Sequence, residues 1–161
     1  MAQKKTITEI LALNCPELIT ELYGFVSEKR RTGQALLAIE EETYLALSML
    51  LDIEMEGFVD LFHQLYTLRE TYIVESMLHK LELKRLAELF SEARSIFTDG
   101  KVELTEEEYK EINPFGHDVR WQRFDEIGNE ILAEGSEIFL MGDRVCTYVR
   151  AHVNEFQLRG D

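Results

Sequence analysis

The sequence predicts an all-α fold, a single compact bundle of about seven helices around a buried central helix, with residues 1–161 forming one domain. Apolar residues recur at helical spacing along the chain, and no useful length alternates apolar and polar residues as a strand would. In the stretch 44–66, only Ser48 and Asp52 are polar before Ile53. A helix that is hydrophobic all round must be enclosed, so we expect this stretch to be the central helix.

The first predicted helix runs to about Arg31. Asn14 is a favourable N-cap, and Pro16 falls in the first turn, where its missing N–H costs nothing. The basic run 29–31 followed by Gly33 is typical of a helix C-terminus, where cations complement the helix dipole.

The remaining helices follow the central stretch. Gly57 is expected to mark a break or a tight approach. Beyond it one helical face is predicted from Phe58, Leu61, Phe62, Leu65, Tyr72 and Ile73. Later helices are predicted over 86–97, ending at Thr98-Asp99-Gly100; over 106–112, with a Thr105/Glu108 capping box; over 121–132, closed by Gly135; and over 137–157, with Cys146 and His152 on its apolar stripe.

The chain is strongly acidic, with 17 Lys plus Arg against 31 Asp plus Glu and a formal net charge of -14. Phosphate-rich partners and anionic membranes are therefore repelled, so we expect no direct nucleic-acid binding and no membrane binding, whereas basic proteins are attracted. Plain solubility is the alternative explanation. The excess lies in two blocks: residues 34–68 hold seven acids and no base, and residues 101–137 hold eleven acids and four bases.

Within these blocks we expect partner-binding carboxylates. Glu126, Glu130 and Glu134 follow one another at i, i+4 and i+8 without an interleaved base, and Glu107 and Glu111 form a second such pair. Like charges at this spacing destabilise a helix, so either a partner compensates them or a solvated face tolerates them. The second expected group is Glu40, Glu41, Glu42 and Asp60.

Carboxylates four residues apart rise about 6 Å along a helix. One DNA strand carries a charge roughly every 3.4 Å of axis. One row therefore has too low a charge density to imitate DNA. Two acidic helices would have to lie side by side, within one fold or across a dimer.

No catalytic motif or cofactor-binding signature is present, and no cofactor is expected. The alternative is a metal-dependent enzyme using Glu56, Asp60 and His63, which share a helical face at i, i+4 and i+7 if the helix continues through Gly57. The lone Asp-x-x-His pair falls short of the two that a di-iron bundle needs.

The first residues lack the apolar core of a signal peptide, and no apolar run approaches the roughly 20 residues of a membrane span, so we expect a cytoplasmic protein. Cys15 and Cys146 have no zinc or redox spacing. They are predicted to be two reduced thiols.

The run LDIEMEGFVDLF over 51–62, with YVRAHVNEF near the C-terminus, resembles the signature of a bacterial family of small helical domains whose characterised example is a DMP-type DNA-mimic protein. Gly57, Phe58 and Phe62 match that family's Gly-Phe segment and aromatic, whereas Met55 and Glu56 replace Asn-Gly and Asp60 replaces Gln. Over residues 35–157, the resemblance implies an acidic, all-helical, homodimeric protein that occupies the DNA-binding surface of a partner such as a helix-turn-helix transcription regulator.

The leading hypothesis is therefore an acidic protein-binding module, not an enzyme, that engages a basic partner and acts as a DNA mimic. An immunity-type inhibitor of a basic nuclease toxin would show the same charge. A structural homodimer without an electrostatic role is a third alternative.

Overall fold

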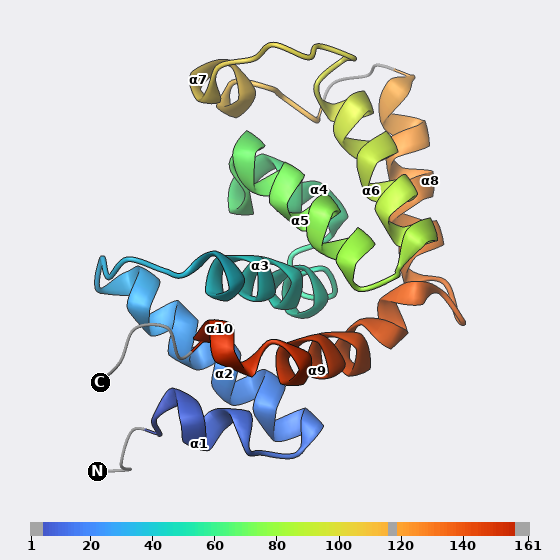
Figure 1. Cartoon of the computed structure of the whole chain (residues 1–161). Coiled ribbons are helices and arrows are strands. Elements are labelled where there is room, and N and C mark those ends of the chain that lie inside the picture. Colours follow the sequence, from blue (N-terminus) through green and yellow to red (C-terminus); the bar gives the residue numbers. More distant parts are fainter. Residues whose placement is uncertain (1–4, 116–118, 157–161) are drawn as a thin grey trace.

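The computed structural model describes residues 5–115 and 119–156 and confirms the all-α class (Figure 1). This part of the chain holds ten α-helices, a π-helix and a 3-10 helix, and no strand. In chain order the elements are α1 (Ile7–Leu11), α2 (Cys15–Arg31), α3 (Ala38–Asp52), α4 (Phe58–Asp60), η1 (Leu61–Leu65, the π-helix), α5 (Leu68–Lys80), α6 (Lys84–Phe97), α7 (Glu106–Lys110), α8 (Arg120–Leu132), η2 (Glu137–Leu140, the 3-10 helix), α9 (Met141–Ala151) and α10 (Val153–Phe156).

Helix α3 is the buried centre that the sequence predicts. It packs against α2, α5 and α9, and Leu45, Ala46, Leu47 and Met49 are at most 1% exposed. The hydroxyl of its buried Thr43 donates to the carbonyl of Ile39 at 2.6 Å, so this polar group has a partner within the helix. Such a helix is stable only because three neighbours remove its apolar surface from water.

The central helix is shorter than predicted, because it stops at Asp52. The chain then turns through 53–57, where Gly57 has φ +93°, a conformation that favours glycine. It resumes as α4 and η1, so the predicted break at Gly57 is confirmed and the continuous helix over 44–66 is wrong.

The face predicted from Phe58 to Ile73 is also wrong in its second half. The Thr67/Glu70 pair forms a capping box and starts α5 as a separate helix. This interruption changes the helical register, so Leu65 is 39% and Tyr72 46% exposed, whereas Phe58 and Phe62 are buried.

An aromatic cluster joins α4 and η1 to α6 and α8. The ring of Phe62 lies 4.9 Å from Phe90, 5.7 Å from Phe97 and 5.4 Å from Phe124, and Phe58 lies 5.0 Å from Phe124. These centroid distances are those of favourable aromatic packing. The cluster fixes α8 against the segment that follows the 53–57 turn.

The predicted boundaries of α2, α6 and α8 are close to those observed, and Asn14 caps α2 through its side chain as expected. The Thr105/Glu108 capping box is confirmed, although α7 ends at Lys110. The predicted last helix is divided into η2, α9 and α10, with the break at His152; its expected end at Gln157 lies outside the described residues. The Nδ1 atom of His152 lies 2.7 Å from the carbonyl oxygen of Tyr148.

Helix α2 packs against α9, and α1 packs against α2. At the contact between α2 and α9 the prediction of two reduced thiols is wrong. Cys15, the first residue of α2, forms a disulfide with Cys146 of α9 across a sequence separation of 131. Figure 1 shows α9 running past α2, which brings these distant segments together. Among the described helices, none has the length and apolar character needed to span a membrane.

Candidate protein-binding surface

Glu40 does not belong to an exposed acidic surface, which corrects its assignment from the sequence. The residue is 1% exposed, and its carboxylate accepts a hydrogen bond from the N–H of Leu37 at 2.9 Å and pairs with Lys29 Nζ at 2.6 Å. It therefore starts α3 and links this helix to α2. A buried carboxylate with two such partners serves the fold and cannot reach a binding partner.

Glu41 and Glu42 are also held by bases of the chain itself. Arg69 donates two hydrogen bonds to the Glu41 carboxylate, at 2.7 and 2.9 Å, and Lys80 Nζ lies 2.6 Å from Glu42. The hydrogen bonds from Arg69 lower the pKa of Glu41. Both acids tie α3 to α5, so much of their charge is compensated within the molecule.

The row on α8 is not free of bases. Arg123 lies 3.4 Å from Glu126 and 2.8 Å from Glu130, and Arg85 of α6 lies 2.9 Å from Glu130. The hydrogen bond from Arg123 is the main reason that the pKa of Glu130 is lowered. Glu134 follows the end of α8 and makes no ion pair among the described residues. The three carboxylates thus have different roles, although their spacing is regular.

Glu107 in α7 and Glu111 directly after this helix are exposed. Two other acids of α7, Glu106 and Glu108, accept hydrogen bonds from backbone N–H groups at helix starts. Glu106 accepts hydrogen bonds from the N–H groups of Leu68 and Arg69 at 3.0 and 3.1 Å, at the start of α5. Glu108 completes the capping box, and the backbone N–H of Thr105 lowers its pKa. Glu107 and Glu111 have no ion-pair partner among the described residues.

The acids that remain without an ion pair form a distinct set in the two acidic blocks. They are exposed, and no described residue hydrogen-bonds or pairs with their carboxylates. The set is Glu54, Glu56, Glu103, Glu107, Glu111, Asp125 and Glu134. Exposed Lys101 and Lys110 are the bases nearest in sequence to the α7 members.

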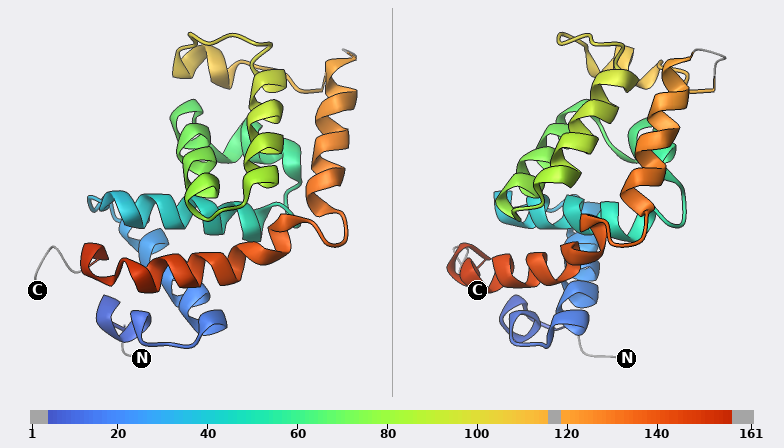
Figure 2. Two further views of the ribbon diagram at one scale, coloured as in Figure 1. Left: turned by 45° about the vertical axis from the view of Figure 1, so that its right-hand side comes forward. Right: turned by 90° about the vertical axis from the view of Figure 1, so that its right-hand side faces the viewer.

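Helix α4 packs on α8, and the 53–57 turn that carries Glu54 and Glu56 leads directly into α4. A Cβ atom placed on Gly128 would lie 3.1 Å from the Cβ of Phe58, so the two helices are in close contact there. Asp125 and Leu132 stand at i-3 and i+4 from Gly128, on the same side of α8. Figure 2 shows the 53–57 turn near α8 in both views.

We name this region, defined by Glu54, Glu56 and Asp125, the acidic flank. It also carries an apolar side chain, because Met55 is 79% exposed between the two glutamates. The opposite side of α8 bears Arg123 and its ion pairs with α6. Within the described chain, α8 therefore has one side on which Glu126 and Glu130 are paired with Arg123, and another on which Asp125 makes no ion pair.

The proposed metal site is not assembled. The turn at Gly57 separates Glu56 from the helix that carries Asp60 and His63, so the three side chains do not share a helical face. Asp60 instead accepts a hydrogen bond from Gln64 at 3.0 Å, and the His63 ring meets Phe115 edge-on at 5.7 Å. In the part of the chain that the structure describes, no group of three or more His, Cys, Asp or Glu is arranged to hold a metal ion.

A surface groove of about 470 Å³ lies among α3, α5 and α7. Its apolar lining comes from Leu68, Tyr72 and Ile73, and its charged residues are Glu42, Arg69 and Glu106. All three charged side chains are engaged in the ion pairs and hydrogen bonds described above. The groove thus offers an apolar surface, but its charged groups are committed to the fold.

Sequence reasoning did not assign Glu54, Glu103 and Asp125 to partner binding, and placed Glu56 only in the metal site. A local signal distinguishes Asp125 from Glu126: no base stands three or four residues from Asp125, whereas Arg123 is three residues before Glu126. For Glu54 and Glu56, the signal was Gly57, because the turn it introduces exposes the residues before it.

Comparison with known proteins identifies one relationship. The sequence model of the DMP19-like protein family matches residues 34–152, well over half of the chain. The matched segment runs from just before α3 to the end of α9, and it includes the acidic flank and α7. Neither a curated protein nor a solved structure matches the chain.

Proposed function

We propose that this chain, which belongs to the DMP19-like protein family, is an acidic protein-binding module that holds a basic surface of a partner protein. The observation that carries this proposal is that the acidic residues fall into two groups, one paired within the fold and one exposed without an ion pair. Many carboxylates are compensated by ion pairs or caps, whereas exposed carboxylates of the acidic flank and of α7 make no ion pair in the described chain. Both regions fall inside the family match.

The finer proposal is that this surface takes the place of DNA on a partner such as a helix-turn-helix regulator. It rests on the resemblance to DMP-type DNA mimics and on charge density. A single helical row supplies a charge about every 6 Å, against roughly 3.4 Å along a DNA strand. Acids from two neighbouring elements raise the density, and the 53–57 turn, which carries Glu54 and Glu56, lies near α8, which carries Asp125.

Electrostatic attraction of this kind acts mainly on association. Exposed charges raise the association rate at low ionic strength and lose their effect as salt screens them. Met55, on the acidic flank, adds an apolar contact that salt does not weaken. The proposal therefore expects a complex that forms fast at low salt and slowly at high salt.

The test is capture of partners from bacterial lysate with the immobilised protein at low and high salt, followed by mass spectrometry. The proposal expects capture of a basic DNA-binding regulator at low salt. The regulator's DNA site should compete with the immobilised protein for the regulator. A basic nuclease whose activity the protein inhibits would instead support the immunity-type alternative. Absence of basic partners at low salt, or salt-independent capture, would contradict the electrostatic mechanism.

A matched pair of variants locates the surface. Glu54→Gln with Glu56→Gln should slow association with the captured partner. Glu17→Gln with Glu155→Gln changes the net charge equally, at exposed positions outside the acidic flank, and should have the smaller effect. Equal slowing by both pairs would indicate that only the overall charge matters.

A further inference from the structure

The disulfide between α2 and α9 joins two sulfur atoms in different surroundings. Cys15 is half-buried at the beginning of α2, whereas Cys146 is 2% exposed within α9. A reagent from solution therefore reaches Cys15 first. In thiol–disulfide exchange, accessibility helps to decide which sulfur is attacked.

Two electrostatic influences act on the sulfur of Cys15. It is the first residue of a 17-residue helix, whose N-terminal end carries the positive end of the helix dipole. Cysteines at helix N-termini are among the reactive cysteines of proteins, because the dipole stabilises the anion. One opposing charge is close, since Asp143 Oδ1 lies 3.8 Å from Cys15 Sγ.

From this asymmetry, we propose that Cys15 and Cys146 form a thiol–disulfide exchange site for small-molecule thiols of the glutathione type. Cys15 is the residue that forms the mixed disulfide, and Cys146 is the residue that resolves it. The proposal is independent of the binding function. It assigns a redox role to the contact between the N-terminal helices, which precede the family match, and α9.

In the reducing direction, the thiolate of a small thiol attacks Cys15 Sγ. The protein disulfide breaks, and Cys146 leaves as a thiolate and takes up a proton. A second small thiolate then attacks the small-molecule sulfur of the mixed disulfide and releases the Cys15 thiolate, which the start of α2 stabilises. Two small thiols are oxidised to their disulfide, and the protein disulfide is reduced to two thiols. Oxidation reverses these steps.

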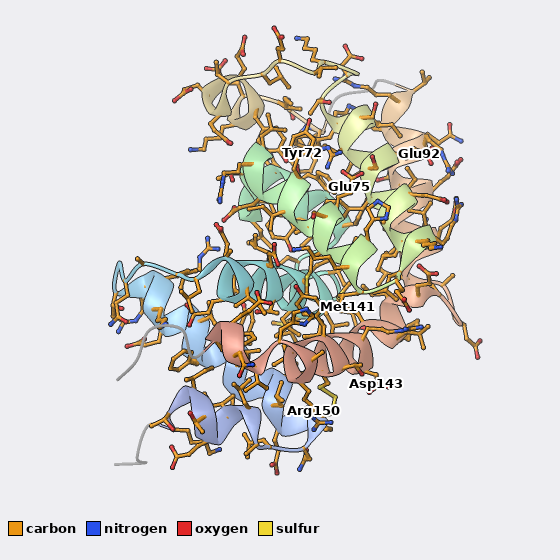
Figure 3. The ribbon with its side chains drawn as sticks, viewed as in Figure 1. Tyr72, Glu75, Glu92, Met141, Asp143 and Arg150 are labelled. Atoms are coloured by element: carbon orange, nitrogen blue, oxygen red, sulfur yellow. A yellow bond between two sulfur atoms is a disulfide. The ribbon has the colours of Figure 1, made fainter. Side chains whose placement is uncertain are left out.

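Exchange can take place in the folded protein, because other contacts hold α2 in place. Leu18, Leu22 and Val26 are fully buried, and Arg150 Nη2 donates to the carbonyl of Leu13 at 3.0 Å. Figure 3 labels Asp143 and Arg150 on α9, which faces the N-terminal helices. Reduction thus removes a covalent link between α2 and α9 and leaves their noncovalent packing.

The first experiment equilibrates the full chain in reduced and oxidised glutathione without denaturant, with mass spectrometry for thiol state and circular dichroism for folding. We expect reversible reduction of a protein that stays helical. In the Cys146→Ser variant we expect one glutathione adduct, on Cys15, and in Cys15→Ser we expect little or none. Reduction that requires denaturant, or equal modification of the two variants, would overturn the proposal.

A second experiment tests the local electrostatics in the Cys146→Ser background. Asp143→Asn should increase the rate at which Cys15 reacts with oxidised glutathione by about two- to fivefold, because it removes a nearby negative charge. Asp125→Asn, on the acidic flank, is the matched control and should leave this rate unchanged. Equal rates in the two variants would contradict the assigned environment of Cys15.

Discussion

Arg123 and Glu130 lie on the same exposed side of α8, with Nη1 of the arginine 2.8 Å from Oε1 of the glutamate. They are seven residues apart, about two helical turns. Arg123 also contacts Glu92 of α6 at 2.7 Å, so it links a row of acids on α8 to the neighbouring helix. The row of acids on α8, which the sequence predicts to lack bases, is therefore partly neutralised by Arg123 in the folded protein.

The first prediction contrasts two members of that row. Glu130→Gln removes charge-assisted hydrogen bonds to Arg123 and Arg85 and should lower the melting temperature. Glu134→Gln removes a carboxylate that has no ion pair in the described chain and should leave the melting temperature unchanged or slightly higher. Thermal unfolding followed by circular dichroism measures both. Identical shifts would show that the Arg123 contacts do not stabilise the fold, and high salt should reduce any difference.

The second prediction is a pH dependence that arises from Glu41. The hydrogen bonds from Arg69 place its folded-state pKa below the ordinary value of 4.5. Its stabilising contribution is therefore complete above pH 4.5 and is lost as the pH falls through the lower folded-state pKa. Glu41→Gln should cost about 0.5–1 kcal/mol at neutral pH and nothing in strong acid. Urea unfolding at a series of pH values tests this, and a pH-independent difference would count against it.

The third prediction concerns the buried pair of α2 and α3. Glu40→Ala leaves Lys29 and the Leu37 N–H without their partner and should reduce the free energy of unfolding by about 2–3 kcal/mol. Glu42→Ala, which breaks the more exposed contact to Lys80, should cost about 1 kcal/mol or less. Urea unfolding compares the two. In a Lys29→Met background Glu40→Ala should cost less, and additive losses would argue against a direct coupling.

The fourth prediction uses two glycines within helices. At Gly128 an added Cβ would meet the Cβ of Phe58 at 3.1 Å, so Gly128→Ala should push α4 from α8 and cost about 1–2 kcal/mol. At Gly24 an added Cβ meets nothing within 4 Å, so Gly24→Ala should stabilise the protein by about 0.5–1 kcal/mol. Both are measured by chemical unfolding. Stabilisation by Gly128→Ala would mean that α4 and α8 pack less tightly than described.

The sequence by itself determined the features that depend on residues a few positions apart. The all-α class, the limits of α2 and α6, the Asn14 cap and the Thr105/Glu108 capping box follow from local spacing, and the structure confirms them. The break at Gly57 belongs to the same class, because a turn that favours glycine is a local requirement. Physically, capping and helical periodicity act within one or two turns of the chain.

Only the tertiary structure decided which charges and thiols meet. Arg69 reaches Glu41 across 28 positions, and Cys15 reaches Cys146 across 131. Such contacts depend on where separate helices cross, which burial of the apolar core sets and which a linear pattern of acids does not encode. For this reason the regular rows in the sequence included the buried Glu40 and the paired Glu130. The acidic flank likewise depends on the packing of α4 against α8, which joins segments far apart in the sequence.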